Sequence, residues 1–296
     1  MIRKLPVLAA VCAVMGFLAF WILTIPKTVL ASALPARTAD LTNGRTMFFA
    51  GGCAGCHAVP KQDDPTKLGG GVALRSPFGT FYAPNISPDQ DDGIGKWTEA
   101  QFVTAMTKGT SPAGEHLFPA FPYPSYQRMM RDDVRDLFAF IKTLPPVRGR
   151  VRGHDVPFPF NVRFLIGGWK FLFLDGREFK PEPAQSPEWN RGAYLVNGPG
   201  HCAECHSPRN ALGAIIESKR FAGGPSPSGQ GGTPDITQRK LANWTAEDIA
   251  LMLEDAQTPD AGPVGGEMAE VVRNTAQLSK EDRQAMAIYI KSLQPR

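Results

Sequence analysis

Two five-residue stretches combine residue types and a spacing that suit covalent attachment of an iron porphyrin. They read Cys-Ala-Gly-Cys-His at 53–57 and Cys-Ala-Glu-Cys-His at 202–206. Two thiols three residues apart lie on one helical turn and can reach both vinyl groups of one porphyrin, and the histidine that follows can ligate the iron. The sequence therefore predicts two covalently bound haem c groups. The predicted attachment residues are Cys53, Cys56, Cys202 and Cys205, and the predicted iron ligands are His57 and His206.

Disulfides or zinc are the alternative uses of these cysteines. A zinc site of the Cys-x-x-Cys type needs two more ligands at a defined later spacing. The remaining histidines, His116, His154 and His201, do not form a paired pattern of this kind in each half. The one further cysteine, Cys12, lies in an apolar segment. The residues therefore favour haem over both alternatives.

Each iron also needs a ligand on its other side, and a methionine thioether there suits electron transfer. In the second half, Met268 stands in a Gly-rich loop before the last helix and is the predicted ligand. The matching loop of the first half, residues 116–126, contains no methionine. Met129, just before the last helix of that half, is the predicted ligand there. His116 is the alternative, and it would lower the reduction potential.

The motifs belong to two copies of one plan, repeated at an interval of about 149 residues. A short helical stretch precedes each motif, a Gly-rich loop follows it, and a Trp-Thr pair then begins another helix. Thr98 and Thr245 are the expected N-caps of that helix, and Gln101 completes a capping box. Closing helices are predicted over 132–144 and 280–293. Because neither half shows alternation over the length of a strand, we predict an all-α fold.

Composition and patterning divide the chain into four parts. These are an N-terminal membrane anchor or signal segment at 1–36, a first haem domain at 37–148, a Phe/Pro-rich connecting segment at 149–187 and a second haem domain at 188–296. The connecting segment is too apolar for a solvated linker. It either packs across both haem domains or turns apolar surface toward a partner subunit or the membrane. The net charge of +4, with no clustered Lys/Arg stripe, excludes a nucleic-acid partner.

The N-terminal part contains an uncharged run of 21 residues from 5 to 25, preceded by Arg3 and Lys4. Such a run is long enough to span a bilayer as a helix. Positive charge before it places the N-terminus inside. We expect a retained transmembrane helix in the bacterial inner membrane with the haem domains in the periplasm, because haem is attached to cysteine outside the cytoplasm. A signal peptide cleaved near 31–33 is the alternative.

Several stretches resemble the membrane-bound cytochrome c subunits of bacterial periplasmic alcohol, gluconate, sugar and aldehyde dehydrogenases. They lie at 79–86, 116–126, 157–163 and 205–213, and the resemblance extends over nearly all of 41–293. It implies two cytochrome c-like domains, a distal methionine on each haem, and electron transfer from a dehydrogenase subunit to ubiquinone, a soluble cytochrome or a terminal oxidase. The best-known members carry three haems. Many have Ala-Met-Pro-Tyr where this chain has Ala-Phe-Pro-Tyr at 120–123.

A dihaem enzyme, such as a thiosulfate dehydrogenase or a peroxidase, is the alternative function. Some thiosulfate-oxidising cytochromes use a distal cysteine, but Cys12 is far from both motifs in the chain. A peroxidase needs an open iron position. No constellation of proton-transfer residues stands out, so the sequence favours an electron-transfer subunit over an enzyme.

Overall fold

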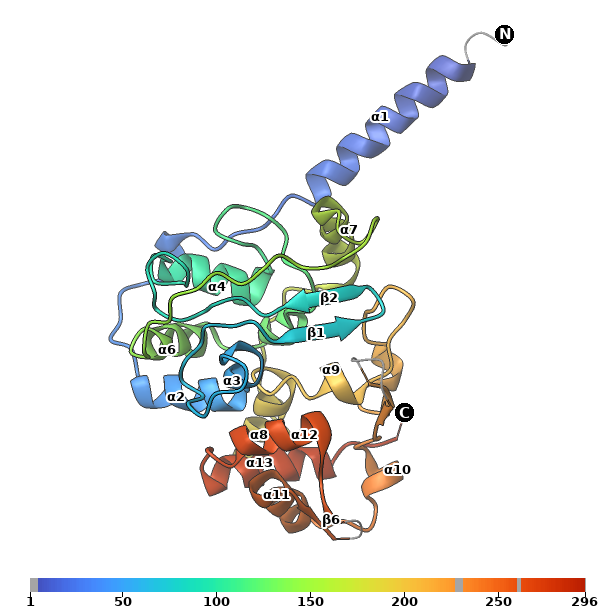
Figure 1. Cartoon of the computed structure of the whole chain (residues 1–296). Helices are drawn as coiled ribbons and strands as arrows, with labels where there is room; N and C mark the ends of the chain where they lie inside the picture. Colours follow the sequence, from blue (N-terminus) through green and yellow to red (C-terminus); the bar gives the residue numbers. More distant parts are fainter. Residues whose placement is uncertain (1–4, 227–230, 260–261, 296) are drawn as a thin grey trace.

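The computed structural model describes residues 5–226, 231–259 and 262–295, and two halves within it follow a similar helical plan (Figure 1). The helices of the first half are α2 (Leu41–Ala50), α3 (Cys53–His57), α4 (Glu99–Lys108), α5 (Tyr123–Tyr126) and α6 (Arg131–Ile141). Those of the second half are α8 (Pro187–Asn197), α9 (Ala203–His206), α10 (Gln238–Leu241), α11 (Ala246–Asp255), α12 (Gly266–Thr275) and α13 (Lys280–Lys291). Two short 3-10 turns lie at Ala31–Ala33 and Glu217–Lys219.

The structure also contains strands, so the predicted all-α fold is wrong. Among the described residues, three antiparallel pairs join β1 (Ala73–Ser76) with β2 (Gly79–Tyr82), β3 (Gly224–Pro225) with β4 (Gly232–Thr233), and β5 (Gln257–Thr258) with β6 (Gly262–Pro263). Strands of two to four residues are too short to show alternation in a sequence. An isolated hairpin is marginal in water, and the first is extended by Asp155, which exchanges two backbone hydrogen bonds of 2.9 Å with Thr80.

The N-terminal helix α1 (Leu5–Leu23) extends away from the rest of the chain, and its base contacts α7 (Arg163–Phe173) (Figure 1). It ends two residues before the apolar run does, where the Thr24 hydroxyl donates to the Phe20 carbonyl at 2.7 Å. Its 19 residues rise about 28 Å. Within the described residues, no helix is both long and apolar enough to cross a membrane. The prediction of a transmembrane anchor is therefore corrected, and with it the placement in the bacterial inner membrane.

A glycine allows the first and last helices of each half to cross closely. In the first half α2 packs on α6, and in the second α8 packs on α13. A Cβ atom on Gly44 would lie 2.2 Å from the backbone oxygen of Asp136. A Cβ atom on Gly192 would lie 1.8 Å from the backbone oxygen of Ala285. Each crossing therefore depends on the absence of a side chain at that one position.

The predicted helix caps are confirmed. Thr98 and Gln101 form a capping box at the start of α4, and Thr245 and Asp248 form the same box at the start of α11. Each box satisfies two backbone N–H groups that the first helical turn leaves without partners. The equivalent caps fix the same helix start after each Gly-rich loop.

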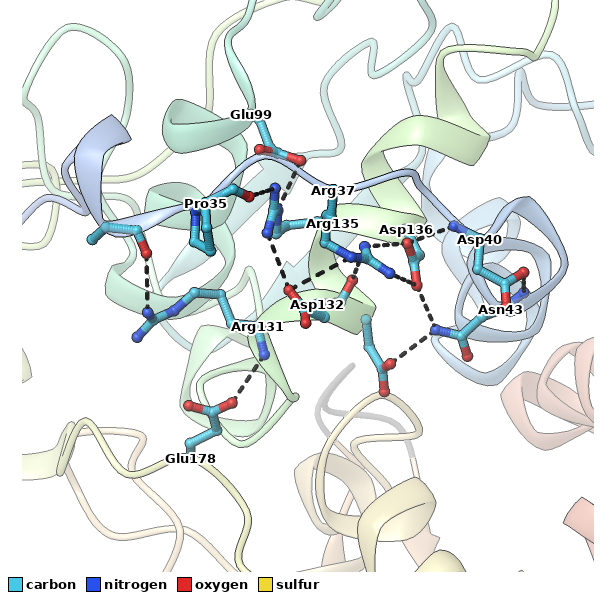
Figure 2. A network of polar contacts seen from close by, with 12 residues as sticks. Pro35, Arg37, Asp40, Asn43, Glu99, Arg131, Asp132, Arg135, Asp136 and Glu178 are labelled. Carbon is cyan, nitrogen blue, oxygen red and sulfur yellow. Dashed lines mark hydrogen bonds and ion pairs between the residues drawn. The ribbon is translucent and has the colours of Figure 1, made fainter.

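Charged residues hold the segment between α1 and α2 against α6 (Figure 2). Arg135, which is buried, donates to the Pro35 carbonyl at 2.8 Å and lies 2.9 Å from the Glu99 carboxylate. Arg37 pairs with Asp136, which also accepts from the Asp40 amide at 2.9 Å. These contacts orient the start of α2, the helix that leads into the first Cys-x-x-Cys-His motif.

The connecting segment contacts both halves. Trp169 of α7 donates from its indole nitrogen to the Leu212 carbonyl of the second half at 2.9 Å. Phe179 donates its amide to the Arg128 carbonyl of the first half at 3.0 Å. Packing across both halves is therefore one role of this segment.

Candidate haem-binding sites

The first motif forms the short helix α3, which follows α2 after a sharp turn. Gly52 makes this turn with φ +54°, in the left-handed region that favours glycine. The turn starts the helix at Cys53, and Cys56 lies three residues on, on the same side of the helix. Burial raises the pKa of Cys53 to about 12, so its sulfur stays a thiol.

His57 is held in the tautomer that a metal ligand requires. Its Nδ1 lies 2.8 Å from the Pro84 carbonyl oxygen, which can only accept, so Nδ1 carries the proton and Nε2 is left with a lone pair. Burial lowers the pKa of His57 and keeps the imidazole neutral. The His57 carbonyl in turn accepts from the Gly70 amide at 2.8 Å. A hydrogen bond on the far nitrogen is the usual way in which proteins orient a metal-bound histidine.

The second motif repeats this arrangement. His206 Nδ1 donates to the Pro234 carbonyl at 2.8 Å, and the His206 carbonyl accepts from the Gly223 amide at 2.9 Å. Burial raises the pKa of Cys202 to about 12 and that of Cys205 to about 11. The residues at both motifs thus fit a covalently attached haem: two protonated thiols on one turn and one neutral imidazole with a free Nε2.

The alternative uses of the cysteines find no support in the structure. No disulfide bond joins any of the five cysteines. In the part of the chain that the structure describes, no three His, Cys, Asp or Glu side chains gather as a site for a bare metal ion. Cys12 lies exposed on α1.

The two predicted distal residues lie in different settings. Met129 is almost fully buried, at 1% exposure, within the same apolar core as Ala54 and Tyr126. Met268 is half-buried and lies in the first turn of α12, so it stands on a helix and not in the predicted loop. The same helix approaches the first motif, because a Cβ atom on Gly55 would lie 3.1 Å from Glu270 Cγ.

His116, the alternative ligand of the first iron, belongs to another hydrogen-bond network. Its Nδ1 lies 3.1 Å from Lys170 Nζ of α7, and its ring also bonds the backbone of Thr24. Lys170 Nζ is buried and further donates to the Gly109 carbonyl at 3.0 Å. Both side chains therefore join α7 to the first half beside the base of α1.

This contact predicts a loss of stability in acid. Burial, followed by the charge of Lys170, lowers the pKa of His116 from 6.5 to about 4. Between these values the unfolded chain binds a proton that the folded chain does not, so the free energy of unfolding falls as pH drops from 6.5 toward 4. His116→Gln should reduce the slope of the unfolding free energy against pH. The reduction should correspond to at most about one bound proton per chain. Urea unfolding across this pH window, followed by circular dichroism, measures it, and an unchanged pH dependence would contradict the assignment.

The structure brings the two motifs together. A Cβ atom on Gly51, just before α3, would lie 3.7 Å from the Pro199 carbonyl oxygen, just before the second motif. The negative charge of Glu267 contributes to a raised pKa at both Cys56 and Cys205, after the larger effect of burial. The two attachment sites therefore share one boundary between the halves.

Sequence reasoning missed the roles of Glu204 and His201 at this boundary. Glu204, between the cysteines of the second motif, is buried and accepts from the Ser125 hydroxyl of the first half at 2.7 Å. Arg209 pairs with the same carboxylate at 2.7 Å. His201 reaches the first half as well. The only sequence signal is position: Glu204 lies inside the second motif and His201 directly precedes it.

Comparison with known proteins agrees with this geometry. The family model for cytochrome c matches residues 41–145 and again 190–294. The chain belongs to the cytochrome c family. A diheme cytochrome c-type protein of Cereibacter sphaeroides is 47% identical over 291 residues, covering 98% of this chain and 97% of the relative. Together these matches show that this cytochrome c carries two covalent haem c groups.

Two further relatives are subunits of larger assemblies. The cytochrome c subunit of alcohol dehydrogenase (quinone) from Gluconacetobacter polyoxogenes is 34% identical over 281 residues, covering 90% of this chain and 59% of the relative. The cytochrome c subunit of gluconate 2-dehydrogenase from Pantoea cypripedii is 33% identical over 270 residues, covering 87% and 60%. The chain thus spans about three-fifths of each of these two relatives. Its family role is electron transfer and not catalysis of substrate oxidation.

Proposed function

We propose that this dihaem cytochrome accepts electrons from a dehydrogenase subunit and passes them on to quinone, a soluble cytochrome or a terminal oxidase. The observation that carries the proposal is the pair of equivalent motifs, each with a neutral histidine whose Nδ1 is fixed by a backbone carbonyl. The names of the dehydrogenase-subunit relatives support the kind of donor. When bound, each haem supplies a one-electron carrier.

The residues of the chain would hold and orient the two haems. Cys53, Cys56, Cys202 and Cys205 would attach the two groups, and His57 and His206 would ligate them. Met129 and Met268 are the proposed distal ligands. Thioether ligation raises a reduction potential and favours electron transfer over reaction with small molecules. The buried position of Met129 suits a ligand shielded from water.

Replacing each distal methionine tests the ligand assignment. Ferric haem with His/Met ligation shows a weak far-red absorbance band. Met129→Leu and Met268→Leu should each remove about half of this band, and the double variant should lose all of it, because each iron loses its thioether. His116→Gln is the matched control and should leave the band intact. A band that survives Met129→Leu at full height assigns the first distal position to another residue.

Mixing the oxidised holoprotein with a dehydrogenase tests the function itself. The catalytic subunits of alcohol, gluconate and fructose dehydrogenases, each with its substrate, serve as donors. We expect at least one donor to reduce both haems rapidly, with two electrons taken up per chain. Dithionite is the control that shows both haems to be reducible. Full reduction by dithionite without reduction by any dehydrogenase would contradict this donor class. Tight carbon monoxide binding to the reduced protein would favour a dihaem enzyme instead.

A further inference from the structure

A single side chain crosses the boundary between the two attachment motifs. His201 directly precedes Cys202, and its Nε2 lies 3.2 Å from the carbonyl oxygen of Gly51. Gly51 in turn stands two residues before Cys53. Since a carbonyl oxygen only accepts, the imidazole donates through Nε2–H. This hydrogen bond therefore links the backbone just before Cys53 to the residue just before Cys202.

The backbone of His201 makes the left-handed turn that Gly52 makes before the first motif. Its φ is +38°, on the left-handed side that side-chain-bearing residues seldom adopt. The His201 carbonyl accepts from the Glu204 amide at 2.8 Å, which ties this conformation to the start of α9. A sparsely populated conformation persists when the surroundings determine it, and such residues cluster at functional sites. Here the conformation belongs to the residue whose ring reaches the other half.

The surroundings of the imidazole keep it in place. The ring of Tyr126, which is buried, stands edge-on to the His201 ring with centroids 5.6 Å apart. Beside it, the hydrogen bond between Ser125 and Glu204 joins the halves a second time. The side chain of His201 thus has a defined orientation, and water has little access to the Tyr126 face.

We propose that His201 provides the electronic coupling between the two haem attachment sites. The route runs along the backbone from Cys53 to Gly51 and across the hydrogen bond to the His201 ring. It continues through the side chain and backbone of His201 and across the peptide bond to Cys202. One electron passes from the reduced site to the oxidised site, and no bond or proton changes place. Bonded and hydrogen-bonded paths carry an electron far better than gaps of equal length. This inference rests on the proposed electron-transfer function.

Two substitutions separate coupling from simple packing. His201→Asn tolerates the left-handed conformation, but its shorter side chain withdraws the donor from the Gly51 carbonyl. His201→Gln places an amide N–H near the position of Nε2 and restores the donor. In half-reduced holoprotein, flash photolysis measures the rate of electron exchange between the haems. We expect a several-fold slower exchange in His201→Asn and recovery of most of the rate in His201→Gln, with both reduction potentials unchanged.

A second measurement tests the bond without reference to electron transfer. In fully reduced holoprotein labelled with ¹⁵N and ¹³C, the His201 Nε2 should show scalar coupling to the carbonyl carbon of Gly51, and this coupling should vanish in His201→Asn. If the coupling is present but the exchange rate of His201→Asn equals that of the wild type, His201 only packs and the inference is overturned. If the coupling is missing in the wild type, the bridge is also overturned. If dehydrogenases reduce neither haem while exchange still depends on His201, the proposed donor fails and the bridge stands.

Discussion

A variant with serine at both Cys202 and Cys205 is expected to retain one covalent haem per chain, where the wild type carries two. Each pair of thiols lies on one helical turn and would serve one porphyrin, so loss of one pair should leave the other site complete. The second half should also lose its cooperative unfolding transition, because a domain of about 110 residues buries little apolar surface without its cofactor. The mirror variant, serine at Cys53 and Cys56, should leave the haem of the second half.

Mass spectrometry of the intact chain counts the covalent haems directly. Cys12→Ser is the matched control, since Cys12 is exposed on α1 and belongs to neither motif. It should keep both haems. A chain that still carries two covalent haems after loss of Cys202 and Cys205 would contradict the assignment of one haem to each motif.

The second large effect is expected at the helix crossing of α8 and α13. Gly192→Val should destabilise the second half by about 3 kcal/mol or more, because overpacking a tight contact forces side chains and backbone apart. A Cβ atom at position 192 would lie 1.8 Å from the Ala285 carbonyl oxygen and 3.0 Å from Tyr289 Cβ, so the helices cannot keep their present distance. Even Gly192→Ala should be clearly destabilising.

Gly153→Ala is the control for the helix-crossing variants. A Cβ atom at Gly153 meets nothing within 4 Å, so we expect a change of less than about 0.5 kcal/mol. Thermal unfolding of the holoprotein, followed by circular dichroism, compares the variants. Similar melting temperatures for the Gly192 and Gly153 variants would show that α8 can shift without loss. Gly44→Val, at the equivalent crossing of α2 and α6, should reproduce the effect in the first half.

The sequence predicts what depends on local patterns. The two motifs, the repeat and the threonine caps at Thr98 and Thr245 are visible because each rests on a few residues with fixed spacing. The carbonyls of Pro84 and Pro234 lie in the loops that follow the motifs, and their hydrogen bonds to the motif histidines become visible only in the fold.

The features that the sequence did not predict depend on particular contacts that no short pattern of residues encodes. The β1–β2 hairpin depends on Asp155, more than 70 residues further along the chain, which exchanges backbone hydrogen bonds with Thr80. The end of α1 depends on Thr24, whose hydroxyl donates a hydrogen bond back to the Phe20 carbonyl of the helix. The contact of His201 with Gly51 depends on how two halves meet, which no local pattern encodes.

The equal proximal hydrogen bonds have a consequence for energetics. Both motif histidines donate to a proline carbonyl over 2.8 Å, so the two proposed iron ligands should have imidazoles of similar basicity. A difference in reduction potential between the two haems would then originate elsewhere, in the distal ligands and in nearby charges such as the Glu204–Arg209 pair. The direction in which electrons flow between the two haems can therefore be changed through the proposed distal ligands Met129 and Met268, without substitution of any residue in either attachment motif.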